Sequence, residues 1–159
     1  MGCGKTTIGR VLAASLGWEF FDLDQIIEQK LRQSIPETFQ LSGEGEFRKR
    51  ERESLQLLTR DPAVIATGGG CFIYNRDWML QHGTVIYIEV PFAALVNRIG
   101  ADAGRPLWRN AEHLYQEREA EYRRAHLTVD GTLTAGEVAS EIVRRIRTQT
   151  AAEKKIPVD

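Results

Sequence analysis

The sequence has few cysteines and no long apolar run. Its two cysteines, Cys3 and Cys71, are too few for a disulfide framework and form no CxxC pair, so we expect a reducing, cytoplasmic setting. No apolar run approaches the roughly 20 residues that span a membrane. We also expect no signal peptide, because Met1 leads directly into a glycine-rich polar stretch.

Neither sign of charge dominates the composition. The formal net charge is -1, which gives no reason to expect nucleic acid or a membrane surface as a partner. The histidines have no metal-ligand spacing. A length of 159 residues with 42% hydrophobic residues suits one domain. We expect this domain over residues 1–147, as a monomer, followed by a polar, disordered tail over residues 148–159.

Helical and strand-like patterns alternate along the chain. The predicted helices are 6–17, 24–34, 34–43, 44–61, 75–83, 91–100, 111–126 and 134–149, and the predicted strands are 18–24, 63–67, 84–90 and 127–131. Such alternation predicts an α/β fold, in which helices cover both faces of a parallel sheet. Ligands in such folds bind at the carboxyl ends of the strands.

The opening "MGCGKTT" contains the second half of a phosphate-binding loop. Gly4-Lys5-Thr6 fits the end of the pattern G-x-x-x-x-G-K-[ST], whose first glycine would precede Met1. Backbone amides at the start of the next helix favour a phosphate there, so Gly2, Cys3 and Thr7 become nucleotide-binding candidates as well. The alternative is a glycine-rich end that caps an ordinary helix.

Two further motifs follow predicted strands. In "FFDLD", Asp22 and Asp24 are two residues apart, so on a strand both would face the same way, and they could serve Mg²⁺ and a substrate hydroxyl. Alternatively, Asp24 caps the next helix. In "TGGG", the glycines 68–70 suit a backbone that approaches a ligand closely or needs a positive φ, or a tight turn.

Three arginines lie in separate predicted elements. Arg48, Arg105 and Arg118 could each bind a carboxylate or a phosphate, but nothing in the local sequence shows that they converge. Three pairs on a predicted helix are four residues apart: Glu44 and Arg48, Glu46 and Arg50, and Lys49 and Glu53. We expect each pair to support that helix by a few tenths of a kcal/mol.

Together these stretches resemble the shikimate kinases, small P-loop kinases of the nucleoside-monophosphate-kinase type. The resemblance runs from Gly2 to about Ile146 and rests on "GCGKTTIGRVLA", "FFDLDQIIE", "SIPETF…GEGEFRKRE", "VIATGGG", "GRPLW" and "REAEYRRAH", in this order. It implies a three-layer parallel α/β fold and the ATP-dependent phosphorylation of the 3-hydroxyl of shikimate, a step toward aromatic amino acids. ATP and Mg²⁺ are the implied cofactors.

On the nucleotide side, the resemblance assigns five residues. Lys5 and Thr6 keep the roles of the phosphate loop, with Thr6 on Mg²⁺. Asp22 looks like the residue that holds Mg²⁺ through water. Arg105, in the lid over residues 101–110, matches the arginine that reaches the ATP phosphates. Arg98 falls where the family has an arginine that stacks on adenine.

On the substrate side, the resemblance assigns a carboxylate clamp and an acid. Asp24 matches the residue that binds the shikimate hydroxyls and positions the attacking one. Arg48 and Arg118 match the pair that holds the shikimate carboxylate, with Gly69 of the triple glycine (Gly68, Gly69, Gly70) close by. Glu51, one helical turn after Arg48, looks like the partner of that arginine.

The sequence departs from the family at its start. The family has a strand before the loop, in the middle of the sheet between the third and fourth strands, and this sequence has none there. Three readings stay open: a truncated version of a longer protein, a rearranged sheet whose flanking strands pair directly, and a relic without turnover. A binding protein without catalysis and another small P-loop kinase, such as a gluconate kinase, are the alternative functions.

Overall fold

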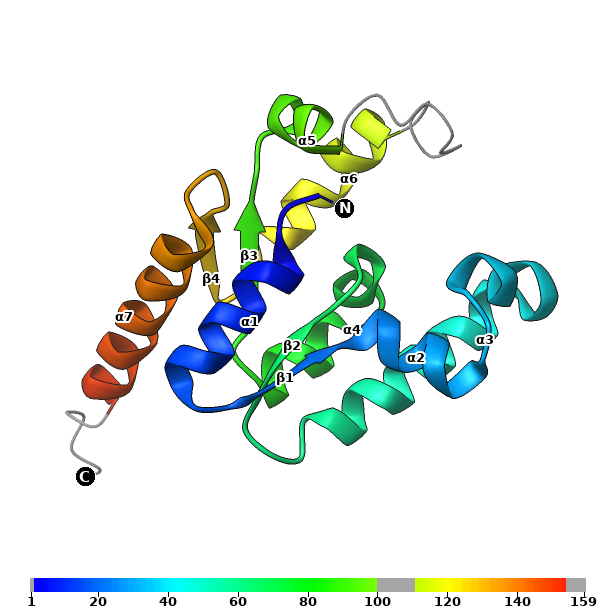
Figure 1. Cartoon of the computed structure of the whole chain (residues 1–159), viewed down its shortest axis with the longest axis horizontal. Helices are drawn as coiled ribbons and strands as arrows, with labels where there is room; N and C mark the ends of the chain where they lie inside the picture. Colours follow the sequence, from blue (N-terminus) through cyan, green and yellow to red (C-terminus); the bar gives the residue numbers. More distant parts are fainter. Residues whose placement is uncertain (1, 100–110, 154–159) are drawn as a thin grey trace.

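A computed structural model describes residues 2–99 and 111–153, with side chains given outside 98–99, 111 and 149–153. The helices are α1 (Lys5–Leu16), α2 (Leu23–Leu31), α3 (Ile35–Leu58), α4 (Gly69–His82), α5 (Phe92–Ile99), α6 (Ala111–Tyr122) and α7 (Ala135–Glu153), and the strands are β1 (Glu19–Asp22), β2 (Ala63–Ala66), β3 (Ile86–Glu89) and β4 (Leu127–Asp130). Figure 1 shows this α/β arrangement.

The described strands form two separate parallel sheets. β1 pairs with β2, and β3 pairs with β4. β2 and β3, the strands that the sequence places on either side of the missing one, belong to different sheets, so the reading in which they pair directly is wrong for this structure. The α/β class agrees with the sequence prediction, and among the described residues no strand lies between β2 and β3.

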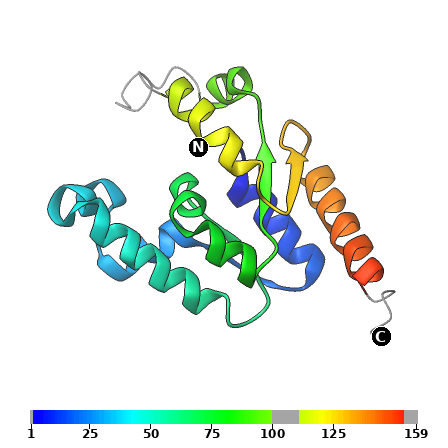
Figure 2. The same ribbon diagram turned by 180° about the vertical axis from the view of Figure 1, so that it is seen from behind.

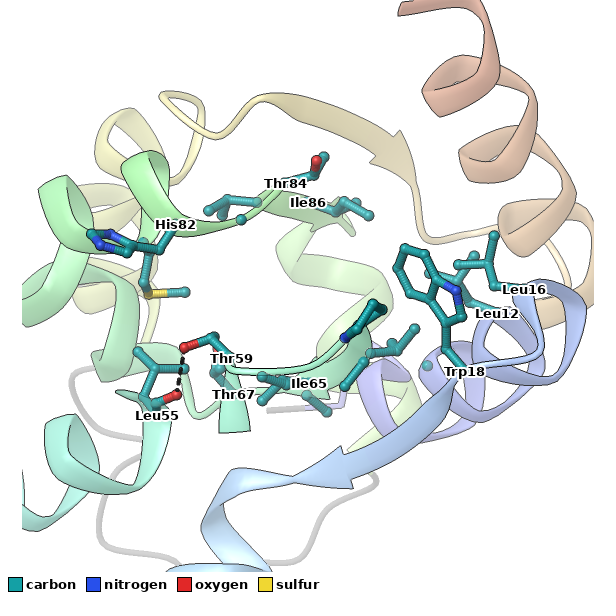
Figure 3. A pocket seen from close by; sticks show the side chains of 18 of the residues that line it. Leu12, Leu16, Trp18, Leu55, Thr59, Ile65, Thr67, His82, Thr84 and Ile86 are labelled. Carbon is teal, nitrogen blue, oxygen red and sulfur yellow. Dashed lines mark hydrogen bonds between the residues drawn. The ribbon is translucent and has the colours of Figure 1, made fainter. Parts of the chain in front are cut away.

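An apolar groove lies between the two sheets. It has a volume of about 570 Å³ and is bordered by residues of both β2 and β3. Figure 3 shows Leu12, Leu16 and Trp18 on one side of it and Ile65 and Ile86 among the strand residues. α1 lies in front of this region in Figure 1, and α4 is turned to the viewer in the reverse view of Figure 2. The groove therefore lies at the centre of the sheet layer, between helices.

The structure has two apolar clusters, of which the first joins the two sheets and the second lies within the half of the molecule built on β1 and β2. The buried residues of one are Ile8, Leu12, Val129, Val138, Ala139 and Ile142, and those of the other are Leu23, Ile27, Phe47, Leu55 and Cys71. α1 contributes to the first cluster, and its Gly9 lets Phe20 of β1 approach so closely that a Cβ would meet the Phe20 ring at 2.6 Å. α1 thus packs on both halves and fixes its own N-terminus relative to them.

Several predicted boundaries were wrong. β1 ends at Asp22, α4 begins at Gly69 rather than at residue 75, and α6 ends at Tyr122. α7 continues to Glu153, so the predicted disordered tail is wrong for 148–153, and 154–159 lie outside the described residues.

One other feature agrees with the sequence prediction. A non-helical Gly43 (φ 78°, ψ 164°) separates the two predicted helices within α3. Within the described part of the chain, no helix is long and apolar enough to cross a membrane.

Candidate active site

The N-terminus of α1 presents the phosphate-loop residues. Gly4 precedes the helix with a φ of 83°, in the left-handed region that favours glycine, and no side chain caps the helix. The first-turn amides and the positive end of the helix dipole are therefore available to an anion. Lys5 donates a hydrogen bond from Nζ to Sγ of Cys3 at 3.8 Å, while Gly2 and Thr7 are exposed beside them.

Thr6 and Asp22 meet at the carboxyl end of β1. The Thr6 hydroxyl donates to Oδ2 of Asp22 at 2.9 Å, and Oδ1 of Asp22 accepts from the backbone amide of Gln25 at 3.4 Å, which makes Asp22 the N-cap of α2. A hydroxyl and a carboxylate are hard oxygen ligands of the kind that bind Mg²⁺ alongside water and phosphate. The described residues contain no cluster of three or more His, Cys, Asp or Glu side chains suited to a metal.

Asp24 lies in the first turn of α2 rather than on the strand. The expectation that both aspartates share a strand face was wrong because the chain turns into α2 directly after Asp22. The capping alternative for Asp24 was wrong as well, since Asp22 takes that position. Burial raises the pKa of Asp24, the charge of Asp22 raises it further, and Lys5 lowers it in part. Asp24 is thus within electrostatic reach of both Asp22 and Lys5.

The triple glycine packs against two of the predicted substrate residues. A Cβ on Gly68 would lie 2.9 Å from Oδ1 of Asp24, and a Cβ on Gly70 would lie 2.5 Å from Nη2 of Arg48. None of the three glycines has a positive φ. Close approach, rather than backbone strain, is therefore the reason for glycine here, and it brings Asp24 and Arg48 to one place.

Arg48 is held by two carboxylates of its own helix. Its Nη1 donates to both carboxylate oxygens of Glu51, at 3.1 and 3.0 Å. Its Nε and Nη2 donate to Oε1 of Glu44, at 3.1 and 2.9 Å. The guanidinium also lies 4.4 Å from the ring centroid of Tyr74. Glu51 is buried, which raises its pKa, and the hydrogen bond from Arg48 lowers that pKa in part.

Arg118 approaches the same place from α6. Burial raises the pKa of Tyr122, and the nearby Arg118 lowers it in part. The charge of Arg118 also helps to hold the pKa of Glu44 low, so Arg118 is within electrostatic reach of the Arg48–Glu44 pair. The structure therefore brings together two of the three predicted arginines. Arg105 lies outside the described residues, as does the side chain of Arg98.

Sequence reasoning missed two residues of this site. Tyr122 donates from its hydroxyl to the carbonyl oxygen of Gly69 at 2.7 Å, which ties α6 to the start of α4. Tyr74 covers one face of the Arg48 guanidinium and is half exposed. Each aromatic lies four residues after a residue that the sequence did single out, Arg118 and Gly70, but nothing local distinguished them from packing residues.

Comparisons with known proteins point to one family by sequence and by structure. The family model "Shikimate kinase" matches residues 1–147. Shikimate kinase 2 of Salmonella heidelberg (strain SL476) is 37% identical over 161 residues, covering 94% of this chain and 89% of the relative. The structure of the shikimate kinase from Acinetobacter baumannii in complex with shikimate has a TM-score of 0.84 at 38% identity, over 94% of this chain and 89% of that one.

A second solved structure extends the comparison. The shikimate kinase from Aquifex aeolicus has a TM-score of 0.82 at 31% identity and covers 94% of each chain. The fold and the second half of the phosphate-binding loop, Gly4-Lys5-Thr6, thus define a kinase of the small P-loop type, an ATP-dependent phosphotransferase. The chain belongs to the shikimate kinase family.

Proposed function

We propose that this chain transfers the γ-phosphoryl group of ATP to the 3-hydroxyl of shikimate. The observation that carries the proposal is the convergence on the triple glycine. Asp24 packs against Gly68, and Arg48 packs against Gly70. An acid suited to a hydroxyl and a cation suited to a carboxylate thus flank one short stretch of backbone, as a hydroxylated carboxylic acid requires.

Arg48 and Arg118 are the proposed carboxylate clamp. Arginine suits this role because its planar fork matches a carboxylate. Glu51 would keep Arg48 aimed, since it is buried and binds the guanidinium through Nη1 alone. Binding at both arginines would place the substrate next to Asp24. The proposal includes a cytoplasmic setting and a monomeric enzyme.

The nucleotide would bind at the other end of the site. Lys5 and the first-turn amides of α1 would hold the phosphates, and Thr6 and Asp22 would hold Mg²⁺, which supplies positive charge to the phosphate oxygens when bound. Asp24 would accept a hydrogen bond from the attacking hydroxyl and orient it toward the phosphate. Phosphoryl transfer needs mainly such positioning and charge neutralisation. Arg98 and Arg105 keep their proposed roles toward ATP from the family resemblance.

A coupled assay of ADP release tests the proposal. Release should depend on added shikimate and should be much weaker with gluconate. Arg48→Ala and Arg118→Ala should each weaken shikimate binding and leave ATP affinity nearly unchanged. Arg50→Ala is the matched control, because Arg50 is exposed on the same helix and pairs with Glu46 at 2.8 Å. Unaltered shikimate binding in both clamp variants would refute the substrate assignment.

A binding protein without turnover is the alternative function. It predicts that shikimate raises the melting temperature while ATP with Mg²⁺ does not. A catalytically competent chain should be stabilised by both ligands, because any ligand that binds only the folded state stabilises it. Thermal shifts with each ligand separately, followed by the coupled assay, distinguish the two.

A further inference from the structure

All three nitrogen atoms of the Arg48 guanidinium already donate hydrogen bonds to carboxylates of the chain. A guanidinium offers five N–H donors in a fixed fork. Nη1 donates to Glu51, while Nε and Nη2 both donate to a single oxygen of Glu44. The edge formed by Nε and Nη2 is one that an incoming carboxylate would use for two parallel hydrogen bonds. In this structure that edge holds a carboxylate from the chain itself.

The two carboxylates on Arg48 differ strongly in exposure. The side chain of Glu51 is 1% exposed and that of Glu44 is 55% exposed. Displacing Glu51 would leave a buried carboxylate without its partner, which is costly. Displacing Glu44 would release an exposed side chain into water, where an ion pair contributes little. A ligand would therefore replace Glu44 and leave Glu51 in place.

Position along the chain also allows Glu44 to move. It directly follows Gly43, whose backbone is non-helical and interrupts α3. Glu51, by contrast, lies well inside the second part of the helix. Glu44 therefore begins the second part of the helix at an exposed position, where its side chain can rotate away from Arg48 into solvent.

We infer that Glu44 occupies the carboxylate position of the clamp in the unliganded protein and that the substrate carboxylate displaces it. The inference rests on the proposed function, since it needs Arg48 to bind that carboxylate. Glu44 acts on the reaction through Arg48. Between turnovers it accepts the hydrogen bonds of the Arg48 guanidinium, and it competes with the substrate carboxylate for them.

The surroundings of Glu44 fit this role. The hydrogen bond from Arg48 holds the pKa of Glu44 below its usual value, and Arg118 and Tyr74 lower it further. Glu44 is therefore a charged carboxylate that contacts Arg48 and lies within electrostatic reach of Arg118. Since only a carboxylate of comparable charge replaces it well, Glu44 makes the site select acids over uncharged polyols.

The test is the sign of the change in substrate affinity. Glu44→Gln and Glu44→Ala should tighten shikimate binding by about two- to fivefold, the range of one exposed ion pair, with the larger effect in the alanine variant. Isothermal titration calorimetry with shikimate measures this without catalysis. In the kinetic assay, the KM for shikimate should fall, while kcat and the KM for ATP should stay unchanged.

Glu46→Gln is the matched control, because it removes the same charge from the same helix but pairs with Arg50 instead of Arg48. Its affinity for shikimate should equal that of the wild type. Unchanged or weaker binding in both Glu44 variants would overturn the inference and show that Glu44 merely holds Arg48 in place. If the wild type and every variant fail to bind shikimate, the proposed function itself fails, and the inference with it.

Discussion

Removing the buried carboxylate of the Arg48 network should cost much more stability than removing an exposed one. Glu51 is 1% exposed and binds Arg48 through both oxygens. Breaking a buried ion pair by deleting one partner costs about 3–5 kcal/mol. Arg48 is 17% exposed and keeps Glu44 as a partner in the variant. We therefore expect Glu51→Ala to cost about 3 kcal/mol, at the low end of that range.

The same helix supplies the comparison. Glu53 is 48% exposed and lies 3.6 Å from Arg50, so Glu53→Ala should cost less than about 1 kcal/mol. Glu51→Gln keeps the shape and one acceptor oxygen and should fall between the two. For a domain of this size, about 3 kcal/mol corresponds to a fall in melting temperature of about 6–12 °C.

Urea unfolding followed by far-ultraviolet circular dichroism measures these differences as shifts of the midpoint at a constant slope. A loss below about 0.5 kcal/mol for Glu51→Ala, or a loss equal to that of Glu53→Ala, would refute the reasoning. It would mean that the arginine finds another partner or water when Glu51 is absent. Burial would then contribute nothing to the strength of this pair.

Three further predictions concern other parts of the chain. Since burial raises the pKa of Asp24, the folded state gains stability at low pH and loses it as pH rises through the raised pKa. The Asp24→Asn variant should therefore have a higher melting temperature than the wild type at neutral pH, and the difference should disappear in acid. Its kinase activity should be lost. An equal or lower melting temperature of the variant at pH 7 would contradict this. N-ethylmaleimide should modify the half-buried Cys3, and it should do so more slowly when MgATP is present. It should not modify Cys71 in the folded protein, because the Cys71 thiol is buried and has a raised pKa. Rapid labelling of Cys71, detected by peptide mass spectrometry, would disprove this. A short apolar strand fused ahead of Met1 should raise the melting temperature more than a Gly/Ser extension of equal length, because it can occupy the groove between β2 and β3; equal melting curves would show that the groove does not accept a strand.

Sequence patterns predicted the elements and their order better than the contacts between them. The ion pairs Glu44–Arg48 and Glu46–Arg50 were predicted from spacing alone and are confirmed. The third predicted pair, Lys49–Glu53, was wrong, because Glu53 pairs with Arg50 at 3.6 Å. Spacing determines such pairs because a helix places residues four apart on one face. It could not show that Glu44–Arg48 lies at the triple glycine, since that contact depends on how α3 packs against α4.

The convergence of Arg48 and Arg118 was likewise beyond the local sequence. The two arginines lie on α3 and α6, elements separated by two strands and two helices. Only the family resemblance paired them. For Asp22 and Asp24 the spacing was correctly noted, but it did not apply because the strand ends at Asp22, two residues before Asp24.

The proposed clamp crosses the division between the two sheets. Arg48 and the triple glycine belong with β1 and β2, while Arg118 lies on α6, which leads into β4. Two described polar contacts join these halves beside the site: Tyr122 to the carbonyl of Gly69 at 2.7 Å, and Arg76 to Glu121 at 2.7 Å. With β2 and β3 unpaired, the distance between the arginines depends on α1 and on these contacts rather than on a continuous sheet. Filling the groove should therefore affect substrate affinity as well as stability, because it would fix the two halves of the clamp relative to one another.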